Sequence, residues 1–295
     1  MFKKAQRKQA RLRLALQAAA GGGKTESALR LARGIVGPQG RIAVLDTEHG
    51  SSELYCDITD FDVCLLNPPY TPERYQEVIA FAERDYDILI IDSLSHEWIG
   101  TGGILEIHAA EAKRQRGGNS FAAWANVTPR HNKLINAMLQ SPLHIIATMR
   151  QKTDFVLEDD HNGKKVPRKI GMAPIQREGL EYEFTVVLDL ESRDGAGGWA
   201  IATKDRTRLF ADPRQLSEAD GQALANWLET GVSVEDQIQA DSDQLLATLT
   251  QAAEQGLDPF REAWRANAGP VRDRIANDHD AMDRLRSLTN PTPQQ

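Results

Sequence analysis

Eight residues near the N-terminus have the types and the order needed to hold a phosphate group. Residues 18–25 read Ala-Ala-Ala-Gly-Gly-Gly-Lys-Thr, a relaxed phosphate-binding loop in which Ala18 takes the place of the first glycine. The three glycines without a Cβ are Gly21, Gly22 and Gly23. They allow successive backbone N–H groups to turn toward a phosphate at the positive end of the next helix. Lys24 is expected to reach the β- and γ-phosphates of ATP, and Thr25 to place its hydroxyl on Mg²⁺.

The sequence around this loop supports the functional interpretation over a chance glycine-rich turn. Residues 12–16 alternate as a strand does, and residues 25–36 carry apolar side chains at helical spacing. A phosphate-binding loop needs this strand-loop-helix context. Glu26, in the first turn of the predicted helix, completes the set of candidate nucleotide-binding residues.

Two carboxylates follow predicted strands at the edge where ligands gather in an open α/β sheet. Glu48, in Asp-Thr-Glu after the strand at 41–45, is a candidate to orient the attacking water. An acidic loop residue with no such role is an equally good interpretation of the residues alone. Asp92 ends the apolar strand at 88–91 and is expected to hold Mg²⁺ together with Thr25.

Three cations complete the candidate site. Arg150, after the fifth predicted strand, is placed to sense a γ-phosphate and to pass its presence to a long, mobile loop over residues 153–174. Lys204 and Arg206 lie on one side of an extended segment, suited to reaching the phosphates of a neighbouring subunit. The alternatives are a solvated strand end and a charged strand edge that discourages aggregation.

The elements that must position these residues alternate as in a largely parallel, doubly wound α/β sheet. Strands are expected at 12–16, 41–45, 62–66, 88–91, 143–147, 185–190 and 199–203. Helices are expected at 25–36, 72–84, 103–114, 121–140 and 218–229. The glycine-rich turn at 192–198 predicts that the last two strands form an antiparallel hairpin at the sheet edge.

A shift in composition divides the chain. Residues 1–231 are expected to form the ATPase domain, with a basic extension at 1–10. Residues 232–290 are expected to form a small helical appendage, with short helices at 244–255 and 259–267, and residues 291–295 a disordered tail.

Composition limits the class of protein. The chain has 295 residues and a net charge of −7, so any polyanion must meet a local basic patch. No apolar stretch reaches the ~20 residues that span a bilayer, which predicts a protein without a membrane partner. The two cysteines, Cys56 and Cys64, are expected to be reduced core thiols of a cytoplasmic protein.

Two basic regions are candidates for contact with single-stranded DNA. One combines residues 113–118 with residues 164–169. The other is the N-terminal run Lys3, Lys4, Arg7, Lys8, Arg11 and Arg13. For each region alone, a solvated basic face is the plainer interpretation.

Three phrases carry a resemblance to a known family. They are residues 45–52 (LDTEHGSS), 91–98 (IDSLSHEW) and 176–184 (QREGLEYEF). With the loop at 18–25, these phrases resemble RecA-like P-loop ATPases, and more closely the AAA ATPases of bacteriophages and prophages linked to single-strand annealing and recombination. The resemblance covers about residues 10–212.

The resemblance implies an ATP-hydrolysing recombinase core in the cytoplasm of a bacterial host. It implies action with single-stranded DNA, a homo-oligomer with ATP between subunits, and an annealing or single-strand-binding protein as a partner. It makes Glu48 the catalytic carboxylate, and Lys204 with Arg206 the pair that acts on the neighbouring subunit.

Two other functions remain open at this point. The acidic charge and the appendage favour a nucleotide-gated switch or loader that binds a DNA-processing partner with little turnover. A small-molecule kinase fits less well, because no lid with clustered arginines is evident. Trp98 offers a face for base stacking, although a packed core or interface position is the plainer interpretation.

Overall fold

The computed structural model describes residues 9–115, 120–159, 165–193, 196–232 and 234–289. The chain divides into two compact units. One unit comprises residues 11–228, and the other combines residues 1–10 with residues 229–295. Each unit is described by itself.

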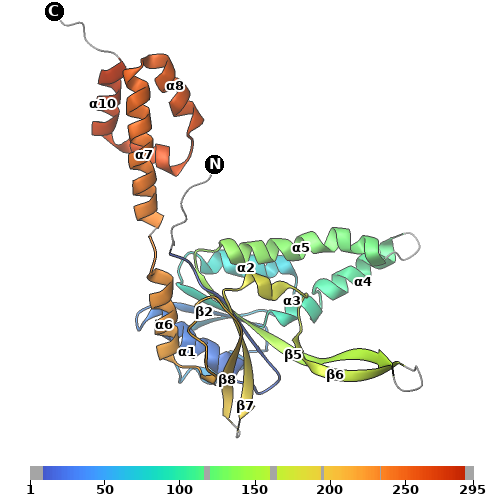
Figure 1. Cartoon of the computed structure of the whole chain (residues 1–295). Coiled ribbons are helices and arrows are strands. Elements are labelled where there is room, and N and C mark those ends of the chain that lie inside the picture. Colours follow the sequence, from blue (N-terminus) through green and yellow to red (C-terminus); the bar gives the residue numbers. More distant parts are fainter. Residues whose placement is uncertain (1–8, 116–119, 160–164, 194–195, 233, 290–295) are drawn as a thin grey trace, which may run out of the picture. The chain divides into compact units, whose positions relative to one another are not determined.

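A mixed, mostly parallel sheet forms the centre of the first unit (Figure 1). Its strands are β1 (Arg13–Ala18), β2 (Ile42–Asp46), β3 (Asp62–Leu65), β4 (Ile88–Asp92), β5 (His144–Asp159), β6 (Lys165–Pro174), β7 (Val186–Arg193), β8 (Ala196–Asp205) and β9 (Arg214–Gln215). The order across the sheet is β3-β2-β4-β5-β1-β7-β8-β9, and β6 pairs with β5. Strands β3 to β7 in this order run parallel, and β8 and β9 are antiparallel additions at the edge.

Helices cover both faces of the sheet because successive residues of a buried strand point to opposite faces. Leu14 and Leu16 of β1 join the core under α1 (Lys24–Val36) and α6 (Glu218–Glu229). Ala15, between them, joins the opposite core. That core lies under α2 (Pro72–Ala82) and α5 (Ser120–Gln140). The predicted fold class, a mostly parallel α/β sheet with an antiparallel edge pair, is confirmed.

Two further helices precede α5. The five-residue α3 (Ser95–Ile99) begins directly after the β4 strand, and α4 (Ile104–Arg114) packs against α5 as an antiparallel helical pair. The predicted helices at 103–114 and 121–140 correspond to α4 and α5. The short α3 was not predicted, because five residues are too few to establish a helical period.

The prediction of a mobile loop over residues 153–174 is wrong. Strand β5 continues past the sheet to Asp159, and β6 returns antiparallel to it from Lys165 to Pro174 (Figure 1). A two-stranded ribbon exposes both faces, so its charged residues hide the apolar alternation by which a strand is recognised. The loop prediction failed for this reason.

Four helices make up most of the described part of the C-terminal unit. They are α7 (Val234–Glu254), α8 (Leu257–Ala266), α9 (Pro270–Asn277) and α10 (His279–Thr289). Their core holds Leu249, Ala253, Ile275 and Leu285. The helical character predicted for this region is confirmed, but four helices take the place of the two expected. The backbone N–H of Gln9 donates to the carbonyl of Val232 at 3.1 Å, so this residue belongs to the second unit.

Three residues lie elsewhere than expected. Cys56 and Cys64 are free and exposed rather than in the core. Cys64 is exposed because β3 is an edge strand of the sheet, and Cys56 lies in the segment between β2 and β3, directly after a short 3₁₀ helix at Ser51–Tyr55. Arg13, expected in a basic surface run, is only 5% exposed. Its guanidinium donates to the carbonyls of Ser141 and Leu143, where it satisfies the chain after α5. Residues 1–8 of the same run, and residues 116–118 and 164 of the other basic region, lie outside the described residues.

Candidate active site at the carboxyl ends of the strands

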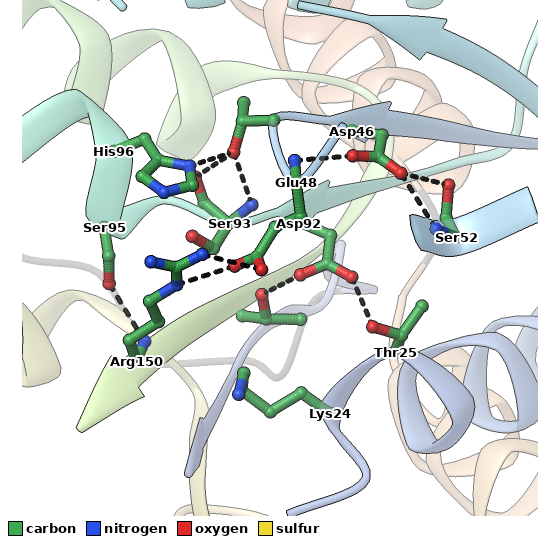
Figure 2. A network of polar contacts seen from close by, with 12 residues as sticks. Lys24, Thr25, Asp46, Glu48, Ser52, Asp92, Ser93, Ser95, His96 and Arg150 are labelled. Atoms are coloured by element: carbon green, nitrogen blue, oxygen red, sulfur yellow. Dashed lines mark hydrogen bonds and ion pairs between the residues drawn. The ribbon is translucent and has the colours of Figure 1, made fainter. Parts of the chain in front are cut away.

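Four motifs from distant parts of the sequence meet in one cavity of about 370 Å³. They lie at the carboxyl ends of β1, β2 and β4 and at Arg150 of β5, where the parallel part of that strand ends, and these positions share one edge because the strands are parallel. The lining residues are Ala20, Gly21, Gly22, Gly23, Lys24, Thr25, Glu48, Tyr55, Asp92, Arg150, Gln151 and Ile175. Figure 2 shows the polar side chains of this group converging from their separate strands.

The glycine-rich loop ends at the first residue of α1. Gly21 and Gly23 have φ angles of 75° and 80°, a left-handed conformation that glycine adopts without strain. The first N–H groups of a helix have no acceptor within the helix, so the start of α1 presents donors to the cavity. Lys24 Nζ donates to the carbonyl of Ala19 at 3.2 Å and, more weakly, to Ala18. Burial lowers the pKa of Lys24, and the charge of Asp92 partly opposes this shift.

Thr25 and Asp92 are joined directly. The Thr25 hydroxyl donates to Asp92 Oδ2 at 2.6 Å, and the Thr148 hydroxyl donates to Oδ1 at 2.6 Å. Burial raises the pKa of Asp92 in spite of these two donors. Among the described residues there is no group of three or more His, Cys, Asp or Glu that could hold a metal ion. The Thr25 hydroxyl and the Asp92 carboxylate are oxygen ligands of the kind that Mg²⁺ takes together with waters and phosphates.

Asp46 shapes the loop that carries Glu48. Asp46 is 1% exposed, and its carboxylate accepts hydrogen bonds from the backbone N–H groups of Glu48 at 2.6 Å and Ser52 at 2.9 Å. It also accepts from the N–H of Gly50 at 3.3 Å and from the Ser52 hydroxyl at 2.5 Å. Four donors on one buried carboxylate fix the turn after β2, and with it the direction of the Glu48 side chain (Figure 2).

Glu48 and Arg150 form a two-pronged ion pair. Arg150 Nε lies 2.8 Å from Glu48 Oε1, and its Nη2 lies 2.7 Å from Oε2. Burial alone raises the pKa of Glu48, but the hydrogen bonds and charge of Arg150 leave it lowered. The backbone N–H of Arg150 donates to the Ser95 hydroxyl at 2.9 Å, which ties the middle of β5 to the start of α3.

A second polar layer lies behind this pair. The Thr47 hydroxyl accepts from the N–H of Ser93 at 2.9 Å and lies 2.7 Å from His96 Nδ1. The His96 ring stacks on Tyr70, with 5.1 Å between centroids. Sequence reasoning missed Asp46, Thr47 and Thr148 as site residues. Their signal is a short polar side chain directly after, or at the end of, an apolar strand.

Trp98 is part of the packing rather than a free stacking face. It stacks on Trp124 at 5.9 Å and meets His131 edge-on at 5.4 Å. The neighbouring Glu97 is fully buried, and its carboxylate pairs with His131 Nδ1 at 2.9 Å and with Gln176 Nε2 at 3.2 Å. The segment after β4 is thus anchored to α5.

The remaining candidates lie away from the cavity wall. Glu26 pairs with Arg30 at 3.0 Å on the outside of α1, and Ala18 is fully buried at the end of β1. Lys204 Nζ donates to the carbonyls of Glu181 at 2.9 Å and Tyr182 at 2.7 Å. Neither Lys204 nor Arg206 lines the cavity of its own chain.

Comparisons with known proteins identify the family. Among the described residues, no helix has both the length and the apolar composition needed to cross a membrane. The search of curated proteins finds no match. One similar solved structure is a KaiC-like protein from the hyperthermophilic archaeon Pyrococcus horikoshii OT3, at 13% identity and a TM-score of 0.36, covering 72% of this chain and 92% of that chain. The family model described as "AAA domain" matches residues 10–214. That match spans more than half of the sequence, so the chain belongs to this AAA domain family of P-loop ATPases.

Proposed function

We propose that this chain binds ATP with Mg²⁺, hydrolyses it, and acts with single-stranded DNA in phage recombination or annealing. The observation that carries the ATPase part is the convergence of Lys24, Thr25, Asp92 and Glu48 on one cavity beside the start of α1. These are the residue types that phosphoryl transfer to water needs.

Each residue has a chemical role in this proposal. The loop N–H groups and Lys24 bind the phosphates, and Thr25 with Asp92 holds Mg²⁺, which neutralises charge on the phosphates. A water oxygen forms a bond to the γ-phosphorus while the bond from that phosphorus to the bridging oxygen breaks, which gives ADP and inorganic phosphate. Glu48 orients the water and accepts its proton.

In this proposal Arg150 moves away from Glu48 before the step. The two hydrogen bonds and the charge of Arg150 lower the pKa of Glu48, so the carboxylate is a poorer proton acceptor while the pair is intact. A γ-phosphate in the cavity offers Arg150 a competing anion. When the Arg150 side chain pairs with that phosphate instead, Glu48 is released. Arg150 is therefore the γ-phosphate sensor in this proposal.

A separate observation supports the DNA part of the proposal. Strand β6 carries Lys165, Arg168 and Lys169 on a ribbon that leaves the sheet next to Arg150. The backbone N–H of Ile175, just after this ribbon, donates to the carbonyl of Arg150 at 2.7 Å. A shift of Arg150 is therefore passed to the ribbon. We also propose a homo-oligomer with ATP between subunits, in which Lys204 and Arg206 act on the neighbouring subunit's cavity.

The second candidate function is a nucleotide-gated switch or loader with little turnover. The Glu48–Arg150 pair favours it, because a carboxylate held in this way supports slow hydrolysis. In this function the appendage binds an annealing or single-strand-binding protein, and ATP controls the assembly.

Steady-state ATP hydrolysis with and without single-stranded DNA separates these functions. We expect the parent protein to be stimulated by DNA, and Lys24→Ala and Glu48→Gln each to reduce the rate at least a hundredfold. Lys24→Ala should also weaken ATP binding, whereas Glu48→Gln should retain it.

Matched controls are available on the surface. Lys133→Ala and Glu53→Gln change exposed residues of the same types and should hydrolyse ATP like the parent. ATP binding without DNA-dependent turnover in the parent would favour the switch. Equal hydrolysis by Lys24→Ala and the parent would end the ATPase proposal.

A further inference from the structure

We infer that Gly197 and Gly198 of β8 are positioning residues for the nucleotide, because they support the phosphate-binding loop from behind. This inference rests on the proposed nucleotide binding by that loop. The two glycines are about 175 residues from the loop in sequence and belong to no nucleotide-binding motif.

Strand β8 meets the loop backbone to backbone. The N–H of Gly198 donates to the carbonyl of Gly22 at 3.0 Å. A Cβ added at Gly23 would lie 2.7 Å from the Gly198 nitrogen, which is closer than real Cβ atoms come to other atoms. A Cβ added at Gly197 would lie 3.1 Å from the Gly23 nitrogen and 3.2 Å from the Gly21 carbonyl oxygen.

The three loop glycines differ in what surrounds them. A Cβ at Gly21 would meet nothing within 4 Å, so this residue borders open space. Gly22 is closed in by the Ala18 side chain, 2.5 Å from the site of its Cβ, and Gly23 by β8. The loop is thus held between its own strand and β8. The absence of side chains at Gly22 and Gly23 serves this packing as well as access for a phosphate.

The support is itself fixed in place. Gly198 has a φ of +82°, and a Cβ there would lie 2.9 Å from Ser27 Oγ in α1. The carbonyl of Gly197 accepts from Gln215 Nε2 of β9 at 3.3 Å. The hydrogen bond from Gly198 to Gly22 therefore links the loop to β8 and, through Gln215, to β9. Preorganised donors bind an anion more tightly because less ordering is lost on binding.

The test compares two strand glycines of the full-length protein, without DNA. Gly197→Ala adds a Cβ against the loop, whereas Gly171→Ala in β6 adds one where nothing lies within 4 Å. Binding of a fluorescent ADP analogue and hydrogen exchange of the amides at 21–25 in the nucleotide-free protein are measured for both. For Gly197→Ala we expect at least tenfold weaker binding and at least tenfold faster exchange, and for Gly171→Ala less than a twofold change in either.

The two readouts keep this inference apart from the proposed function. If Gly197→Ala matches Gly171→Ala in both measurements, β8 does not support the loop, whether or not the parent protein binds nucleotide. If the parent fails to bind nucleotide while the exchange at 21–25 still responds to Gly197→Ala, the proposed function fails and the support stands.

A second variant covers the case that Gly197→Ala does not fold. Gly198→Asn keeps a residue that tolerates positive φ but introduces a clash with Ser27 Oγ. We expect Gly198→Asn to weaken analogue binding at least fivefold and the added Ser27→Ala to restore most of it, while Ser27→Ala alone stays within twofold of the parent. Binding by Gly198→Asn equal to that of the parent would contradict the inference.

Discussion

Single buried side chains decide where the reacting groups of this site lie. Glu48 is the residue proposed to act on water, yet its position is set by Asp46, which does not itself line the cavity. Asp92 is similarly held by two threonine hydroxyls that come from α1 and β5. At this scale, short hydrogen bonds to buried carboxylates set the geometry of the site.

Replacing Asp46 by Asn should separate catalysis from binding. The amide nitrogen of Asn cannot accept, so at least one backbone N–H of the 48–52 loop loses its acceptor, at about 1–3 kcal/mol. We expect Asp46→Asn to lower kcat at least tenfold and to leave ATP affinity within about threefold, as measured by steady-state kinetics and calorimetry. Asp57→Asn, at an exposed position nearby, is the control. A tenfold loss of affinity with unchanged kcat would show that Asp46 does not position Glu48.

His144 should make stability depend on pH. Its Nδ1 accepts from the N–H of Leu12 at 3.1 Å, and burial with the charges of Arg11 and Arg13 lowers its pKa from 6.5 to about 4. The unfolded chain binds a proton near pH 6.5 and the folded chain does not until about pH 4, so stability is lost as pH falls through this window. The loss between pH 7 and pH 5 is about 2 kcal/mol as an upper value.

Urea unfolding at pH 7 and pH 5 measures this effect. His144→Asn retains an acceptor near the position of Nδ1 but does not titrate, so its stability should fall less over the same range. His279→Asn, at an exposed position, should behave like the parent. An equal fall for His144→Asn and the parent would remove His144 as the cause.

At the scale of elements, strands serve two purposes in this protein. The parallel strands bring the motifs to one edge, whereas β5 with β6 and β7 with β8 extend as antiparallel pairs to either side of the cavity. The first pair continues from Arg150, and the second contacts the glycine loop. Each strand pair therefore adjoins a residue or loop of the proposed nucleotide site.

The β5–β6 ribbon is expected to carry DNA contacts. Reversing Lys165, Arg168 and Lys169 to Glu should weaken single-stranded DNA binding at least tenfold at low salt and reduce the slope of log K against log salt by about 2. ATP affinity without DNA should not change. The measurement is fluorescence anisotropy of a labelled oligonucleotide across a salt series.

A charge-matched control lies in the C-terminal unit. Arg261, Arg265 and Arg286 are exposed there, and their replacement by Glu changes the net charge by the same amount. If both triple variants weaken DNA binding equally, the effect is one of overall charge and the ribbon has no specific part.

At the scale of the whole molecule, the proposed role of Lys204 and Arg206 concerns a second copy of the chain. Lys204 lies six residues along β8 from Gly198, which is about 20 Å of strand. Gly198 contacts the loop that lines the cavity, and neither Lys204 nor Arg206 lines it. The proposed role of Lys204 and Arg206 requires a second copy, with a head-to-tail arrangement of subunits.

Mixing two inactive variants tests this arrangement. Lys24→Ala lacks a working phosphate-binding loop but retains Lys204 and Arg206. The double variant Lys204→Ala/Arg206→Ala retains the loop but lacks both of these cations. In mixed assemblies about a quarter of the interfaces combine the two intact halves, so ATP hydrolysis should recover to about a quarter of the parent rate. Each variant alone should remain inactive at the same total concentration. No recovery in assemblies shown to be mixed would place the two cations outside the active site.

The sequence alone determined the parts of this protein that depend on local patterns. The glycine loop, the apolar strands with their terminal carboxylates and the parallel α/β class all follow from residue spacing within short windows, because backbone freedom and burial act over neighbouring residues. Parallel strands also require that the motifs after β1, β2, β4 and β5 share an edge.

Only the tertiary structure decided which partners these residues have. The bond of Arg150 to Glu48, the contact of Gly197 with the loop, the burial of Arg13 and the exposure of Cys64 each depend on strand order and on segments far apart in sequence. The β5–β6 ribbon escaped prediction for a related reason, since two strands that pair outside a core show no apolar periodicity. Contacts between distant segments are set by packing of the whole chain, which no local pattern contains.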